Sequence, residues 1–143
     1  MISRSPRDLA PVFDAILESA LRLCEAANGQ MYLYDAEVYE LVGFRGVNAE
    51  AFSSWQRVSR PGPNTGLGRI LSERQPVHIV DLLEDAATRE ADPVRLKTIE
   101  LLGARTFLAA TVLKDERVIG ALVMYRREVK PFQDKQIALL KSF

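Results

Sequence analysis

The sequence predicts an α+β domain, and three observations support this. The first and last segments repeat apolar residues at helical spacing. Two pairs of strand-like runs are each joined by a short polar connection, which indicates two β-hairpins. Between the hairpins, short helical segments alternate with loops, and such a section can cover one face of a sheet.

The composition narrows the class of protein. The 143 residues fit one domain, and 19 basic residues balance 19 acidic ones, so nothing favours a nucleic-acid partner. One cysteine excludes an internal disulfide and is typical of a reducing compartment. No apolar run approaches the roughly 18 residues that span a bilayer, and the start lacks a signal segment. We therefore expect a cytoplasmic domain without a membrane partner in this segment.

The first element is predicted to be a helix over residues 8–28. Asp8 is suited to cap it, and Pro11 falls in the first turn, where its missing N–H matters little. Asn28-Gly29 is a typical stop signal. Its apolar face consists of Leu9, Val12, Phe13, Ile16, Leu17, Ala20, Leu23, Cys24 and Ala27.

The middle of the chain is predicted to alternate strands with short helices. In chain order we expect a hairpin of residues 31–34 and 38–44, a short helix at 48–55, an edge strand at 56–60, a helix at 66–74 capped by Thr65, a strand at 77–82, a mobile acidic loop at 84–93 and a short helix at 94–102. The second hairpin, residues 106–113 and 118–125, shows little polar alternation, which predicts cover on both faces.

The last helix is predicted to begin at Pro131, a residue suited to the first helical position. Its apolar face continues through Ile137, Leu139, Leu140 and Phe143, and no stop signal follows. We therefore expect one domain over residues 1–143, with residues 131–143 forming the start of a truncated C-terminal signalling helix.

The stretch "RPGPNTGLGRIL", residues 60–71, has the glycine content of a phosphate loop. A P-loop needs Gly-Lys-Ser/Thr, whereas Gly68 is followed by Arg69-Ile70. The dinucleotide fingerprint needs a third glycine where Leu71 stands. A flexible loop leading into a helix is therefore the favoured interpretation. An anion at the N–H groups of Gly66, Leu67 and Gly68 remains the alternative.

No group of residues has the composition of a catalytic or metal site. His78 is the only histidine, and strand alternation directs Val77 and Ile79 inward and His78 the other way. A lone histidine is more typical of a surface or interface than of a metal or haem site. Cys24 lies on the apolar stripe of the first helix, which predicts that it is a buried core residue. The acidic cluster is interpreted as a solvated loop: Asp81, Glu84 and Asp85.

Four segments in this order and spacing resemble a GAF domain, a PAS-related small-molecule sensing module: "FDAILESALRLCEAANGQMYLYD", "PNTGLGRILSERQPVHIVDL", "LLGARTFLAATVLKDERVIGALVMYRREVKPF" and "DKQIALLKSF". The resemblance is to GAF modules of bacterial hybrid sensor histidine kinases, and similar modules precede nucleotide cyclases. It implies a six-stranded antiparallel sheet of order 3-2-1-6-5-4, with the terminal helices on one face. The middle helices and loops would cover the other face and form the pocket.

The sequence departs from several branches of that family. The Asn-Lys-Phe-Asp-Glu signature of cyclic-nucleotide GAF domains is missing, and Cys24 lies on the wrong helix to anchor a bilin. Free-methionine-sulfoxide reductases need several cysteines, and this chain has one. Ala110-Thr111 stands where many relatives have Val-Pro. No cofactor is required by the sequence.

The resemblance implies a sensing and dimerisation module of a two-component sensor histidine kinase, with no enzyme activity of its own and a role in a phosphorelay. Its implied partners are an unknown small molecule, a second copy and a C-terminal output domain. A pocket signal would alter a lid of residues 61–74 and 84–103 and then the packing of the terminal helices. The alternatives are a module of a nucleotide cyclase and a dimerisation spacer without a ligand.

The residues expected to carry these roles fall into three sets. The ligand pocket would be lined by Leu33, Trp55, Ile70, Ile79, Leu102, Thr106, Leu108 and Thr111. The hinge of the lid would be formed by Gly66 and Gly68. The dimer helices would meet through Phe13, Ile16, Leu17, Ile137 and Leu140.

Overall fold

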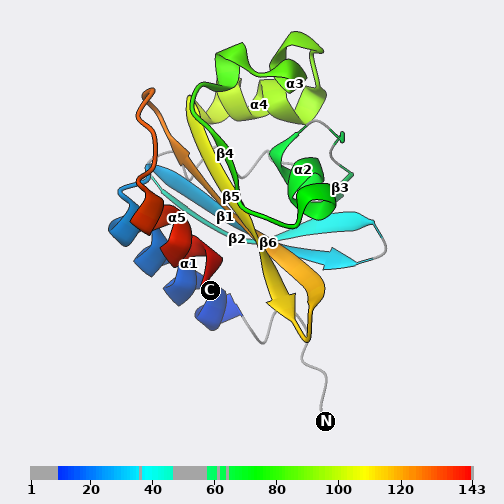
Figure 1. Ribbon diagram of the computed structural model, residues 1–143, viewed down its shortest axis with the longest axis vertical. Helices are drawn as coiled ribbons and strands as arrows, with labels where there is room; N and C mark the ends of the chain where they lie inside the picture. Colours follow the sequence, from blue (N-terminus) through cyan, green and yellow to red (C-terminus); the bar gives the residue numbers. More distant parts are fainter. Residues whose placement is uncertain (1–9, 36, 47–57, 61, 64, 143) are drawn as a thin grey trace.

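A computed structural model describes residues 10–35, 37–46, 58–60, 62–63 and 65–142 and shows one antiparallel sheet (Figure 1). Its order is β3-β2-β1-β6-β5-β4. The strands are β1 (Asn28–Asp35), β2 (Val38–Gly46), β3 (Val58–Ser59), β4 (Val77–Ile79), β5 (Thr106–Lys114) and β6 (Arg117–Arg126). Because β3 has only two residues, five longer strands make almost the whole sheet. The predicted α+β fold and the two hairpins are confirmed, and β1 pairs with β6 at the centre.

Helices cover both faces of the sheet (Figure 1). The helices of one face are α1 (Ala10–Cys24) and α5 (Asp134–Lys141). The other face carries a set of short helices that we call the lid: α2 (Gly66–Glu73), the 3₁₀ helix η3 (Leu82–Glu84), α3 (Ala86–Arg89) and α4 (Pro93–Leu102). The strands therefore lie between two layers, which explains why β5 and β6 lack polar alternation.

Helix α1 ends earlier than predicted. Glu25 takes a left-handed conformation with φ 53°, and the Ala26 N–H bonds to the Leu21 carbonyl at 3.0 Å. This is a Schellman stop formed without glycine. Asn28-Gly29, predicted as the stop, instead begins β1. Residues 8 and 9 of the predicted helix lie outside the described residues.

Helix α5 begins at Asp134 and not at Pro131, so that prediction is wrong. Gln133 is the cap, and it exchanges hydrogen bonds with Gln136 in a capping box. The residues before the cap are held by other groups, because the Phe132 N–H bonds to His78 and the Pro131 carbonyl bonds to Arg126. The tertiary contacts therefore set where this helix starts.

The acidic stretch predicted as a mobile loop contains η3, α3 and the start of α4. Asp81 caps η3 through the Leu83 N–H, and Asp85 caps α3 through the Ala87 N–H. Both carboxylates also accept bonds from arginines, Asp81 from Arg105 and Asp85 from Arg95. The prediction of a solvated acidic cluster is therefore wrong for these two residues. The predicted helix at 48–55 lies outside the described residues.

Candidate functional site

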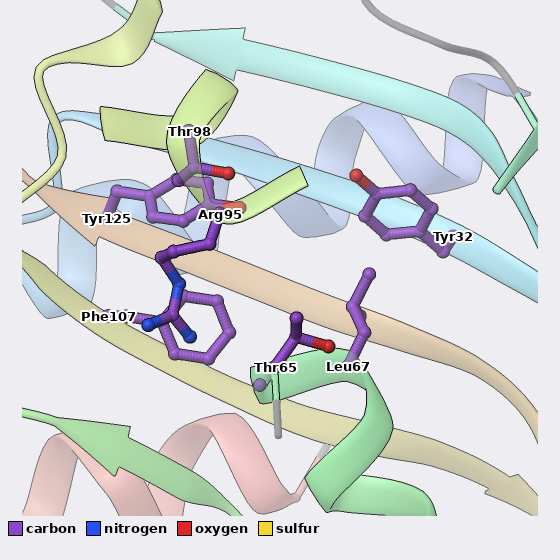
Figure 2. A pocket seen from close by; sticks show the side chains of 8 residues that line it. Tyr32, Thr65, Leu67, Arg95, Thr98, Phe107 and Tyr125 are labelled. Atoms are coloured by element: carbon purple, nitrogen blue, oxygen red, sulfur yellow. The ribbon is translucent and has the colours of Figure 1, made fainter. Parts of the chain in front are cut away.

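A small cavity lies between the lid and the sheet (Figure 2). Its free volume is about 20 Å³, which is room for about one water molecule. Aromatic, hydroxyl and guanidinium groups line it together with the first turn of α2: Tyr32, Thr65, Gly66, Leu67, Arg95, Thr98, Phe107 and Tyr125. The sheet supplies the three aromatic rings, whereas the lid supplies the other five residues.

The first turn of α2 is fixed tightly at this cavity. Thr65 caps the helix as predicted, accepting from the Gly68 N–H at 3.2 Å and donating to the Gly62 carbonyl at 2.7 Å. Tyr39 of β2 donates to the Leu67 carbonyl at 3.0 Å. The first N–H groups of a helix lack partners within it. Gly66 and Leu67, which line the cavity, belong to this first turn, so their N–H groups receive no partner from within the helix.

Gly66 and Gly68 allow a close approach of the backbone to its surroundings. A Cβ on Gly66 would overlap the Phe107 ring, and one on Gly68 would overlap the Gly62 carbonyl. Neither residue is among those with positive φ. Both glycines are explained by close packing, and their predicted role as a hinge stays a prediction.

Arg95 of α4 contributes a buried positive charge to the cavity. Its side chain is 3% exposed, and its Nη1 donates to Asp85 Oδ2 at 2.7 Å. Its backbone N–H bonds to Asp92 Oδ1 at 3.1 Å, which fixes the start of α4. Within the described part of the chain, Nη2 has no hydrogen-bond partner. A buried N–H without an acceptor costs free energy, so this atom requires an explanation.

A second donor without an acceptor lies on the same face of the sheet. The Tyr125 hydroxyl donates to Gln30 Oε1 at 2.7 Å, and Gln30 Nε2 lacks a partner among the described residues. Burial raises the pKa of Tyr125, so its hydroxyl keeps its proton at neutral pH. Two buried donors on this face of the sheet, Gln30 Nε2 and Arg95 Nη2, therefore have no acceptor among the described residues.

Of the predicted pocket residues that the structure describes, none lines the cavity. Ile70, Ile79 and Leu102 belong to the apolar cluster that also contains Tyr32, Leu67, Phe107 and Tyr125. Ile70 and Leu102 belong to the lid and Ile79 to β4, and in this cluster they pack the lid onto the sheet without lining the cavity. Trp55 lies outside the described residues.

Four other residues predicted for the pocket lie away from this cavity in the structure. Leu108 packs in the cluster under α1 and α5, because strand alternation directs it away from Phe107. Leu33 alternates with Tyr32 in the same way. The Thr106 hydroxyl is occupied by the carbonyls of Val80 and Glu128 and by the Lys130 N–H. Thr111 lies at a separate cleft of the sheet edge, next to Arg74 and Lys141.

The residues predicted for a dimer pack inside their own chain. Leu17 and Leu140 are 0% and 1% exposed in the cluster between α1, α5 and the sheet. The others are partly buried against the same cluster: Phe13, Ile16 and Ile137. Helical periodicity identified the apolar stripe correctly, but the sheet of the same chain covers it. Dimer formation itself stays a prediction.

Sequence reasoning missed the polar residues of the cavity. Arg95 and Thr98 lie one turn apart on the short helix that was predicted from its apolar residues alone. Their spacing of three residues places them on one face, and this was the available signal. Tyr32, Phe107 and Tyr125 alternate correctly on their strands, but only the sheet order brings them together.

The opposite face of the sheet contains a buried arginine with a full set of partners. Arg126 donates at 2.7–3.3 Å to the carbonyls of Glu25, Cys24, Lys130 and Pro131 and to Gln136 Oε1. These bonds join the end of α1 to the start of α5. Its guanidinium carbon lies 4.0 Å from the centre of the Phe132 ring.

His78 also binds the segment just before α5. Its side chain points to the face of the sheet opposite Val77 and Ile79, as strand alternation predicts. Its Nε2 accepts from the Phe132 N–H at 3.1 Å, and its ring meets the Phe132 ring edge-on. Burial lowers the pKa of His78, and the nearby Arg126 lowers it further, whereas Asp134 raises it. Cys24 is fully buried, as predicted, and burial raises the pKa of its thiol. Neither residue lies at the cavity.

The described residues contain neither a membrane-spanning helix nor a cluster of metal ligands. None of the helices found there combines the length and apolar character that crossing a membrane requires. In the same part of the chain, no three His, Cys, Asp or Glu side chains gather as a metal site would need.

The fold defines a class of small α+β domains in which one antiparallel sheet carries terminal helices on one face and a lid over a cavity on the other. The GAF domain model matches residues 8–143, so the chain belongs to the GAF domain family. Domains of this family are regulatory modules that sense small molecules and are generally not catalytic. No curated protein sequence matches the chain.

Solved structures with low sequence identity share the fold. A GAF domain/HD domain protein from Geobacter sulfurreducens superposes with a TM-score of 0.75 at 19% identity, covering 96% of this chain and 87% of that one. A domain assigned to a two-component sensor histidine kinase of Sinorhizobium meliloti gives 0.69 at 15%, with 94% and 84% covered. A type II free methionine-R-sulfoxide reductase from Thermoplasma acidophilum gives 0.72 at 13%, with 96% and 89% covered. The same fold thus occurs in proteins of different function.

Proposed function

We propose that this domain senses a small molecule in the cavity under the lid and transmits its presence through the terminal helices. In this proposal the domain serves a two-component sensor histidine kinase in the cytoplasm, and its output domain follows α5. The likeness to a sensor kinase domain supports this parent protein, although other likenesses extend to unrelated activities.

One observation carries the proposal: two adjacent residues of β6 serve opposite faces of the sheet. The Tyr125 ring lines the cavity, and the guanidinium of Arg126 joins α1 to α5. A displacement of Tyr125 therefore moves the backbone that positions Arg126. A ligand changes this arrangement only if it binds the two arrangements with different affinity.

Amide NMR spectra of the chain test the proposal. A panel of small carboxylates, amides, phosphates and nucleosides is titrated while the signals of Gly66 and Leu67 report on the cavity. We expect at least one compound to shift these signals saturably and to shift those of Phe132 and Gln136 with the same midpoint. Binding that leaves Phe132 and Gln136 unchanged would overturn the proposed transmission.

The small free volume of the cavity favours one competing function, a dimerisation spacer without a ligand. About 20 Å³ holds no more than a water molecule or a very small solute while the lid stays in place. In a spacer, no member of the panel shifts Gly66 and Leu67. A concentration-dependent dimer in light scattering would then support the spacer, and a monomer would count against both functions.

A further inference from the structure

The donors at the cavity point to the chemical class of the ligand. Arg95 Nη2 has no acceptor among the described residues, and the amides of Gly66 and Leu67 open the helix beside it. Arg95 belongs to α4 and Leu67 to α2, and the side chains of both line one cavity (Figure 2). A ligand that completes this site must supply acceptor atoms.

We propose that the ligand is a small organic carboxylate whose carboxyl group is bound between Arg95 and the N-terminus of α2. This inference rests on the proposed sensory function and assigns a ligand class to its cavity. A buried guanidinium favours a negatively charged acceptor, and the positive end of the helix dipole adds to that preference. Nη1 already donates to Asp85 and to the Thr88 hydroxyl, so Nη2 is the group of Arg95 that offers donors to a carboxylate oxygen.

The local charges favour a carboxylate over a phosphate. Among the described residues that line the cavity, Arg95 alone is a cation, and it already shares its charge with Asp85. The neighbouring Arg69 pairs with Glu73 at 3.2 Å and lies 3.6 Å from Asp85. These two arginines and two carboxylates cancel in charge. A carboxylate therefore brings one negative charge that Nη2 and the N-terminus of α2 must balance, whereas a phosphate dianion brings two.

The remaining lining restricts the rest of the ligand. The rings of Tyr32 and Phe107 and the side chain of Leu67 form the apolar part of the cavity. The present volume accepts little more than the carboxyl group itself. A larger apolar body requires α2 or α4 to move away from the sheet, while the carboxylate bridges these two helices. Such a ligand would change the lid as it binds.

Sodium acetate and sodium benzoate test this inference against their neutral amides, acetamide and benzamide. Sodium phosphate serves as the other anion, and sodium chloride keeps the ionic strength constant. The amide signals of Gly66 and Leu67 are followed by NMR in the chain and in two variants. Arg95→Met removes the proposed anchor. Arg105→Met removes an arginine that pairs with Asp81 but does not line the cavity.

We expect a carboxylate to shift both amides saturably, with the neutral amides weaker by roughly tenfold or more. Arg95→Met should weaken the carboxylate by a similar factor, and Arg105→Met should leave it unchanged. If Arg95→Met does not fold, Arg95→Lys provides the same test. It keeps the charge without the planar fork, and it should also bind more weakly.

Other outcomes separate this inference from the proposed function. Phosphate binding tighter than the carboxylates, or equal binding of benzamide and benzoate, would overturn the carboxylate while leaving a sensory cavity. Full carboxylate affinity in Arg95→Met would overturn it as well. Carboxylate binding that depends on Arg95 but leaves Phe132 and Gln136 unshifted would support the ligand class and contradict the transmission.

Discussion

Two buried arginines lie on opposite faces of the same sheet and differ in how their donors are used. Arg126, 4% exposed, makes five hydrogen bonds, which equals the number of N–H groups on a guanidinium. Arg95, 3% exposed, has a bound Nη1, while its Nη2 lacks a partner in the described part of the chain. All five N–H groups of Arg126 thus have acceptors, whereas Arg95 keeps donors without one among the described residues.

The partners of the two residues explain what each does. Arg126 donates to four backbone carbonyls at the end of α1 and before α5. Its guanidinium therefore supplies the hydrogen bonds that these carbonyls would otherwise lack. Arg95 binds one carboxylate of the lid and lines a cavity. A saturated buried cation fixes structure, whereas an unsaturated one beside a cavity is suited to a ligand.

The largest effect is expected for Arg126→Met. It leaves several buried carbonyls without donors and removes the contact with Phe132, so we expect a loss of about 3 kcal/mol in the free energy of unfolding. Urea unfolding followed by circular dichroism measures this loss. Arg127→Met is the control, because Arg127 is exposed and should change stability by less than about 0.5 kcal/mol. Equal losses in the two variants would contradict the structural role of Arg126.

The next effect concerns the lid at the cavity of Arg95. Gly66→Ala places a Cβ into the Phe107 ring and should cost about 2 kcal/mol through overpacking. The double variant Gly66→Ala/Phe107→Leu should recover part of the loss, because the smaller side chain makes room. Urea unfolding of the two single variants and the double variant gives the coupling. If Gly66→Ala keeps full stability, close packing against Phe107 is not the reason for glycine at this position.

A smaller effect is expected for Arg95→Met on stability. Arg95→Met removes the Nη1 bonds to Asp85 and Thr88, but Nη2 contributes no bond and Asp85 would keep Arg69 at 3.6 Å. The loss should therefore be about 1.5 kcal/mol. The same urea measurement, compared with Arg126→Met, tests the contrast between the two arginines. A loss as large as that of Arg126→Met would show that Arg95 stabilises the lid in the way Arg126 stabilises the terminal helices.

The same contrast shows what the sequence reveals and what it does not. Apolar periodicity predicted α1, and Thr65 was identified as the cap of α2, because these signals act within a few residues. The stop of α1 at Glu25 and the late start of α5 were missed. Both depend on contacts with Arg126 or His78, which are remote in sequence.

The cavity was less predictable than the fold. Strand alternation correctly separates Phe107 from Leu108, but the sequence does not say which face the lid covers. Arg95 is one of many charged residues in a polar stretch, and only its distance of 2.7 Å to Asp85 distinguishes it from a solvated residue. Burial of a charge is a tertiary property, and local patterns do not contain it.

The smallest effect is expected from protonation of His78. Its pKa is lowered in the folded protein by burial and by Arg126, with Asp134 acting in the opposite direction, so the unfolded chain binds the proton more readily. Stability is therefore fully present above the unfolded pKa of about 6.5, and it falls as the pH drops below that value through the lowered folded pKa. The protonated ring also loses its bond from the Phe132 N–H and places a second cation beside Arg126.

Thermal midpoints measured between pH 7.5 and pH 5.5 test this effect. The midpoint should decline with falling pH in the wild type and stay flat in His78→Gln, since His78 is the only histidine. Equal slopes in the two proteins would show that groups other than His78 control the docking of α5 in this range.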